Sequence, residues 1–162
     1  MAAIIAIVGK SKTGKTTLIE KLITEFKSRG YRIATVKHTF HTVDFDIPGT
    51  DTWRHMQAGS DAVVLSSDKA LMMVKRIADN KRIEDAIEML CEDYDLVLVE
   101  GFKESDLPKI EVHRKEKGSP LMNVKHLIAI ATDERLETPL PQFALTDTQG
   151  IADLIQGIIN NR

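Results

Sequence analysis

Residues 9–16, Gly-Lys-Ser-Lys-Thr-Gly-Lys-Thr, have the types and the spacing of a loop that binds phosphate. They match the pattern G-x-x-x-x-G-K-[ST] at every position. Gly9 and Gly14 permit backbone angles that a Cβ obstructs, so the loop can turn its N–H groups toward an anion. Lys15 brings a flexible cation to the β- and γ-phosphates, and we assign it the catalytic role. Thr16 offers a hydroxyl to Mg²⁺. The segment predicts a site for the triphosphate of a purine nucleotide.

An acidic partner for the metal is expected at the end of a neighbouring buried strand, which Leu96–Val99 resembles. Asp95 precedes this apolar run and Glu100 ends it. Phosphates lie at the carboxyl ends of parallel strands, so we predict Glu100 as the ligand and Asp95 at the opposite rim. Asp44 and Asp46 follow another strand, and Asp46 is the preferred addition. The predicted metal ligands are Thr16, Asp46 and Glu100.

The choice of base is weakly signalled. Two Thr-Asp pairs, 132–133 and 146–147, follow late strands on the same rim. An aspartate there could accept hydrogen bonds from N1–H and the 2-amino group of guanine. The form Asn-Lys-x-Asp is absent, so spacing does not separate GTP from ATP. We predict Asp133 as a nucleotide-binding residue and keep Asp147 as the alternative.

Histidines and an arginine near the long loop give weaker signals. His38 and His41 have the spacing H-x-x-H, but within a loop this spacing fixes no geometry, so we expect phosphate contact or packing rather than zinc. Arg54 could reach an anion or could lie on a solvated helix face. Asp51 or Thr52 could cap the short helix that contains it.

Strand and helix patterns alternate along the chain. This order predicts an α/β fold of the P-loop NTPase type, with a mainly parallel sheet and helices on both faces, in one domain over residues 1–162. The residues 38–50 lack periodicity and predict a long loop. The expected strands are Ala2–Val8, Arg32–Lys37, a pair over Asp61–Ser66 and Leu71–Lys75, Leu96–Val99, Ile110–Val112, Leu127–Ala131 and Phe143–Leu145. The expected helices are Lys15–Arg29, a short one near residues 51–59, Arg82–Cys91 and Ile151–Ile159.

Composition narrows the class of protein. The 162 residues are 43% hydrophobic and 28% charged with a net charge of −2, which argues against a general nucleic-acid binder. Cys91 is the single cysteine, so no intramolecular disulfide forms and a reducing compartment fits. No run approaches the roughly 20 apolar residues of a membrane helix. We expect a cytoplasmic protein without a membrane or nucleic-acid partner, and Cys91 in core packing.

Several segments together resemble the molybdopterin-guanine dinucleotide biosynthesis protein B family, MobB. Besides the phosphate loop, they include K-H-T-F-H from residue 37, E-G-F-K from residue 100 and D-x-x-G from residue 147. The resemblance covers nearly the whole chain. It implies binding of GTP, weak hydrolysis and homodimers. The residues it carries over are Gly9, Lys10, Ser11, Lys12, Thr13, Gly14, Lys15, Thr16, Thr17, Asp46 and Glu100.

The resemblance also implies a place beside the guanylyltransferase MobA, which attaches GMP to molybdopterin. The protein would act as an adapter or GTP supplier, with GTP and Mg²⁺ as ligands. Molybdopterin and molybdoenzyme assembly factors are further candidate partners. Lys12 departs from the small residue of many family members, without expected harm to phosphate binding.

Two other functions compete with this one. A small-molecule kinase would transfer the γ-phosphate to a metabolite, with an acceptor at the loop 38–51. Kinases usually carry arginines in a lid, and we find no arginine-rich insertion, although Arg76 and Arg82 lie near one candidate. A pure binding module would use the nucleotide only to order a partner surface.

Overall fold

The structure is a computed structural model that describes residues 2–39, 43–77, 87–118 and 121–161. The chain divides into two compact units. The larger unit comprises residues 1–38 and 83–162, and the smaller unit comprises residues 39–82. The expectation of a single domain over residues 1–162 stays a prediction.

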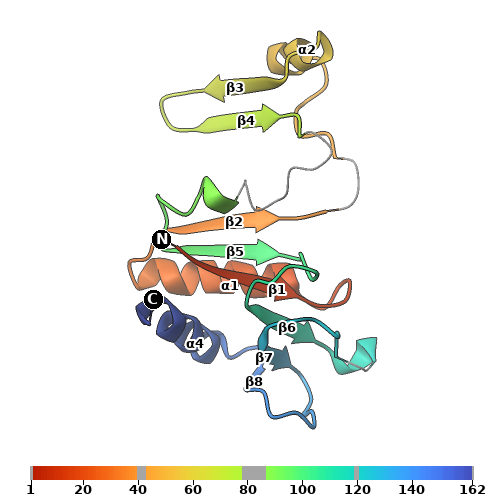
Figure 1. Ribbon diagram of the computed structural model, residues 1–162, viewed down its shortest axis with the longest axis vertical. Coiled ribbons are helices and arrows are strands. Elements are labelled where there is room, and N and C mark those ends of the chain that lie inside the picture. Colours follow the sequence, from red (N-terminus) through yellow and green to blue (C-terminus); the bar gives the residue numbers. More distant parts are fainter. Residues whose placement is uncertain (1, 40–42, 78–86, 119–120, 162) are drawn as a thin grey trace. The chain divides into compact units, whose positions relative to one another are not determined.

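A six-stranded sheet forms the centre of the larger unit (Figure 1), in the order β2-β5-β1-β6-β7-β8. Every neighbouring pair in it is parallel. Parallel pairing aligns the carboxyl ends of all six strands at one edge, where ligands bind in such sheets. The predicted α/β class with a mainly parallel sheet is confirmed. The strands are β1 (Ala3–Val8), β2 (Ile33–Lys37), β5 (Leu96–Glu100), β6 (Lys109–His113), β7 (Leu127–Thr132) and β8 (Gln142–Ala144).

Helices α1 (Lys15–Ser28) and α4 (Thr148–Asn160) pack on one core against this sheet. Leu18, Leu22 and Phe26 recur at helical spacing on α1 and are buried, as the sequence pattern predicted. The core that they share with the sheet and with α4 includes Ile5, Ile7, Leu96, Leu98, Ile110, Val112, Ile151 and Ile155. This packing fixes the start of α1 at the carboxyl edge of the sheet.

A second apolar cluster uses the alternate side chains of β1 and β5. Val8, Val97 and Val99 pack there with Ile87 and Cys91. Cys91 is therefore a core residue, as predicted. The expected helix over Arg82–Cys91 falls partly outside the described residues; positions 87 and 88 are helical and a turn follows.

The smaller unit contains a short helix and a two-stranded hairpin. β3 (Ala62–Ser66) and β4 (Leu71–Lys75) pair antiparallel, which confirms the predicted pair of strands and makes it a hairpin. Helix α2 (Asp51–Gln57) precedes them. We expected Asp51 or Thr52 to cap this helix, and that prediction is wrong. The cap is Thr50, whose hydroxyl accepts a hydrogen bond from the Trp53 N–H.

Among the described residues no helix is long and apolar enough to cross a membrane.

Candidate nucleotide-binding site

The phosphate loop connects the end of β1 to the start of α1, and its two glycines have positive φ. Gly9 has φ 148° and Gly14 has φ 101°. A Cβ on Gly9 would lie 2.5 Å from the Val112 carbonyl oxygen of β6. Gly9 is therefore required for space as well as for conformation. Gly14 caps α1, so the positive end of the helix dipole points toward this loop.

Lys15 lies folded over the loop that precedes it. Its Nζ donates to the carbonyl oxygens of Gly9 at 3.1 Å and Lys10 at 2.8 Å. Burial lowers the pKa of Lys15, the Glu100 carboxylate opposes this shift, and Lys37 adds to it. An ammonium has three protons, so one remains for a phosphate oxygen. A bound polyphosphate would raise this pKa again by supplying negative charge.

Glu100 lies at the carboxyl end of β5, beside the first turn of α1. The Thr16 hydroxyl donates to its Oε2 at 3.0 Å, and Lys37 Nζ lies 3.5 Å from its Oε1. Asp95 lies at the opposite end of the strand, where it accepts from the Arg32 N–H at 2.7 Å. The structure thus separates the two acidic residues as the strand-end argument required.

A hydroxyl and a carboxylate at this distance are suitable for Mg²⁺. Magnesium takes oxygen ligands, keeps several waters and uses one or two carboxylates beside the phosphates of a substrate. Thr16 and Glu100 are donors of this kind, so the pair fits the predicted metal. The described residues hold no cluster of three or more His, Cys, Asp or Glu side chains that could bind a metal alone. A metal here would depend on the phosphates and on water molecules for its remaining ligands.

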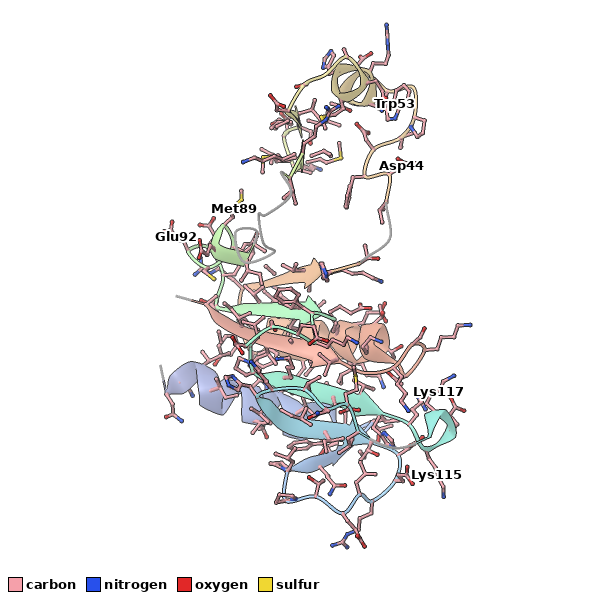
Figure 2. The ribbon with its side chains drawn as sticks, turned by 45° about the vertical axis from the view of Figure 1, so that its right-hand side comes forward. Asp44, Trp53, Met89, Glu92, Lys115 and Lys117 are labelled. Carbon is pink, nitrogen blue, oxygen red and sulfur yellow. The ribbon has the colours of Figure 1, made fainter. Side chains whose placement is uncertain are left out.

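The front of the loop is fastened to a turn that follows β6. Lys10 Nζ donates to the carbonyl oxygens of Lys117 at 3.0 Å and Gly118 at 2.8 Å. These residues belong to the short 3-10 helix η1 (Lys115–Lys117) and its end, and Figure 2 labels Lys115 and Lys117 there. Thr13 is buried, and its hydroxyl donates to Lys10 O at 3.0 Å. The loop is therefore held by a hydrogen bond within itself and by hydrogen bonds to the turn after β6.

Asp133 and Asp147, the two candidate base readers, have different partners. Asp147 caps α4, because its Oδ1 accepts from the Gly150 N–H at 2.9 Å. Asp133 follows β7, and its Oδ1 accepts from the Lys115 N–H at 2.8 Å. Its Oδ2 lies 3.8 Å from the Arg114 guanidinium. Capping accounts for Asp147 without a ligand, whereas Asp133 borders a cavity beside the phosphate loop.

This cavity has a volume of about 350 Å³, within the range of small-molecule sites. The phosphate loop and α1 contribute Thr13, Gly14 and Thr17 to its wall. Arg114 and Asp133 line the other side. Because Thr13 and Gly14 belong to the phosphate loop, the cavity lies beside the predicted phosphate site.

Asp46 and Arg54 lie in the smaller unit. Asp46 Oδ1 accepts from the Ile47 N–H at 2.7 Å. Hydrogen bonds from the Thr52 hydroxyl first, and then from the Ile47 N–H and the Thr50 hydroxyl, lower the pKa of Asp46. Asp46 thus shapes its own turn, and its part in a metal site stays a prediction. Arg54 is exposed, 4.0 Å from Asp51.

The two histidines have separate outcomes. The His38 ring packs edge-on against Phe102, with ring centroids 5.3 Å apart, which is a packing role of the kind we expected. His41 lies outside the described residues. Asp44, labelled in Figure 2, is exposed in the smaller unit.

Sequence reasoning missed Arg114 and Lys37. Arg114 Nε donates to Thr13 O at 2.8 Å, and Lys37 pairs with Glu100. A signal was present, because each residue stands at or directly after the carboxyl end of a strand, on the edge where phosphates bind. The same rule that selected Glu100 could have selected them.

Comparison with known proteins agrees with this arrangement. The family model of molybdopterin guanine dinucleotide synthesis protein B, MobB, matches residues 4–133. The molybdopterin-guanine dinucleotide biosynthesis adapter protein of Haemophilus influenzae is 34% identical over 160 residues, covering 98% of this chain and 90% of the relative. The protein of the same name from Escherichia coli is 33% identical over 161 residues, covering 96% and 92%.

Solved structures give the same answer. A crystal structure of molybdopterin-guanine biosynthesis protein B has a TM-score of 0.80 and 28% identity, covering 97% of this chain and 99% of that chain. A MobB homolog from Bacillus stearothermophilus has a TM-score of 0.75 and 28% identity, covering 98% and 99%. The chain therefore belongs to the MobB family, the molybdopterin guanine dinucleotide synthesis protein B family.

Proposed function

We propose that this protein binds GTP together with Mg²⁺. One observation carries the proposal: the phosphate loop, Lys15 and the Thr16–Glu100 pair occupy one edge of the sheet at hydrogen-bonding distances. Lys15 neutralises the phosphates, and the loop and the α1 terminus present N–H groups to them. Thr16 and Glu100, with Asp46 as a further candidate, would hold the metal, which would neutralise charge on the phosphate oxygens. Asp133 is the proposed base contact.

We propose that hydrolysis is weak. Glu100 is already bonded to Thr16 and paired with Lys37, so it is suited to holding a metal rather than to activating a water molecule. Lys15 would stabilise charge on the phosphates. Among the described residues we identify no base for the attacking water and no arginine finger, and a site without these groups has slow turnover.

We propose that the bound nucleotide serves molybdopterin guanine dinucleotide formation in the cytoplasm, with the protein as an adapter to a MobA-type guanylyltransferase. The names of the relatives from Haemophilus influenzae and Escherichia coli support an adapter role. An adapter needs a surface for other proteins as well as a nucleotide site. Molybdopterin and molybdoenzyme assembly factors are further proposed partners.

We propose that the smaller unit makes protein contacts, and that these include contacts with a second copy of the chain. Val64, Leu65 and Leu71 of its hairpin are exposed by 54%, 54% and 69%. A two-stranded hairpin is marginally stable alone and gains from burial of such side chains. Replacement of Leu65 and Leu71 by Asp should then shift a dimer to monomer in analytical ultracentrifugation.

The decisive experiment combines nucleotide binding with partner binding. Calorimetric titration with GTP and Mg²⁺ should show binding that Lys15→Ala abolishes. Lys27→Ala, at the far end of α1, is the matched control and should bind normally. Partner capture by a MobA-type guanylyltransferase is then measured with and without GTP. Absence of GTP binding by the parent protein, or rapid turnover without any partner, would contradict the proposal.

A further inference from the structure

We propose that Arg114 positions the nucleoside part of the bound nucleotide, as a planar platform in the cavity beside the phosphate loop. The inference rests on the proposed function, because it concerns the same ligand. It concerns a residue that the phosphate-loop pattern does not contain. The proposed ligand is a nucleoside triphosphate whose base and ribose extend past the phosphate loop.

The cavity lies next to the phosphate loop. Thr13, Gly14 and Thr17 line the 350 Å³ cavity and also belong to the phosphate loop or the first turn of α1. A polyphosphate held by the loop would leave the rest of the molecule facing this space. The cavity walls are the α1 face, the ends of β6 and β7 with the residues that follow them, and residues 144–146 at and after the end of β8.

Arg114 is held in place by two neighbours. Its Nε donates to Thr13 O at 2.8 Å, and its Nη1 lies 3.8 Å from Asp133 Oδ2. A Cβ built on Gly14 would lie 3.5 Å from its Nη2. The guanidinium is thus held between the phosphate loop and Asp133 before any ligand arrives. A side chain fixed in this way loses little conformational entropy on binding.

Asp133 supports the position of Arg114. Its Oδ1 accepts the Lys115 N–H at 2.8 Å, and its Oδ2 faces Arg114. The carboxylate therefore fixes the turn after β6 and the arginine that precedes this turn. Asp133 acts on the ligand partly through Arg114, in addition to its proposed contact with the base.

The side chains that line the cavity suit a purine ring. None of the described residues that line this cavity is aromatic, and Arg114 is the planar cation among them. Guanidinium planes stack on aromatic rings, which lysine ammonium groups do less well. Leu18, Val112 and Leu145 provide apolar surface in the same cavity. A purine ring matches a site with a cationic plane and aliphatic walls.

The test compares GTP with inorganic tripolyphosphate, which has the phosphates without the nucleoside. In calorimetric titrations the parent should bind GTP more tightly than tripolyphosphate. In Arg114→Met, GTP affinity should fall about tenfold, whereas tripolyphosphate affinity should fall much less, because that ligand loses only the support that Arg114 gives to the loop. Arg114→Lys keeps the charge and loses the plane, so it should also lose GTP affinity. Arg32→Met, at the amino end of the sheet, is the control and should match the parent.

The outcomes separate the two proposals. An equal loss for both ligands would show that Arg114 acts through the phosphate loop alone, and this inference would be wrong. Equal affinity of the parent for GTP and tripolyphosphate would overturn it without any variant. Failure of the parent to bind either ligand would instead reject the proposed nucleotide site itself. Thermal unfolding of each variant identifies losses that arise from the fold.

Discussion

The Thr16 hydroxyl and the Glu100 carboxylate are joined by a hydrogen bond of 3.0 Å between Oγ1 and Oε2. This bond links the first turn of α1 to the carboxyl end of β5, two segments far apart in the sequence. Both oxygens can bind Mg²⁺, so the pair is the structural reason to expect a metal-dependent nucleotide site. It also allows a sharp test, because the charge of one partner can be removed with little change of shape.

Replacement of Glu100 by Gln should remove the dependence of GTP affinity on Mg²⁺. The amide retains an acceptor for Thr16 but lacks the negative charge that attracts the cation. Affinity measured with Mg²⁺ should fall roughly 10- to 100-fold, the range for loss of a group that supports a metal. Affinity measured in EDTA should change little. Glu104→Gln, an exposed carboxylate, is the control. A Glu100→Gln protein with full Mg²⁺ dependence would reject the assignment.

Replacement of Gly9 by Ala should destabilise the fold and abolish phosphate binding. The new Cβ would meet the Val112 carbonyl oxygen at 2.5 Å, at a residue with φ 148°. Backbone strain of this kind costs about 1–3 kcal/mol, before the cost of the clash. Urea unfolding and GTP titration measure the two effects.

The matched control for Gly9 is Gly157 on α4. A Cβ there meets nothing within 4 Å, and its φ is not positive. Gly157→Ala should therefore stabilise the protein by about 0.5–1 kcal/mol, because alanine loses less conformational entropy in a helix. Equal unfolding midpoints for the two variants would contradict the account of the loop.

Glu111 on β6 should make stability depend on pH. It is 2% exposed, and burial raises its pKa above the ordinary value of 4.5, against the opposing effects of the Met122 N–H, His113 and Lys10. The stability that a raised pKa contributes is present in full below pH 4.5 and is lost as the pH rises through the folded-state pKa. The Glu111→Gln protein has no carboxyl group at this position to titrate, so it does not lose this stability as the pH rises. The free energy of unfolding of the variant, minus that of the parent, should therefore increase with pH.

The measurement for Glu111 is urea unfolding of both proteins between about pH 4 and pH 8. Taking the difference at each pH cancels other titrating groups, such as Asp95, whose pKa is lowered by hydrogen bonds from the Arg32 backbone and side chain. A difference that is constant with pH would show that Glu111 titrates alike in the folded and unfolded chains.

Replacement of Asp147 by Ala should cost stability and leave base selection unchanged. Its carboxylate caps α4 through the Gly150 N–H, and loss of a cap costs about 1 kcal/mol. Asp147→Asn retains a capping oxygen and should lose much less. The ratio of GTP to ATP affinity should be the same in all three proteins. A changed ratio would make Asp147 the base reader in place of Asp133.

Much of the sheet and both long helices could be predicted from the sequence. Leu18, Leu22 and Phe26 repeat at helical spacing, and Leu96–Val99 is a continuous apolar run, so local pattern alone identified α1 and β5. The rule that ligands lie at the carboxyl ends of parallel strands then separated Glu100 from Asp95. These inferences succeed because they depend on short-range periodicity and on strand direction.

Features that depend on distant packing could not be predicted in this way. Lys109, Glu111 and His113 alternate with apolar residues on β6, a pattern typical of a half-exposed strand, yet all three are buried. Lys109 Nζ is satisfied by the carbonyl oxygens of Ser105, Leu107 and Lys125, which only the folded loops bring together. The contacts of Arg114 have the same origin.

The bonds from Lys10 to the carbonyl oxygens of Lys117 and Gly118 have a kinetic consequence. They tie the phosphate loop to the turn after β6, so the two segments would behave as one rigid rim. An incoming polyphosphate would then meet a concave surface that is already shaped. Association would be limited by the encounter of the two molecules rather than by ordering of the loop, as in other preorganised sites.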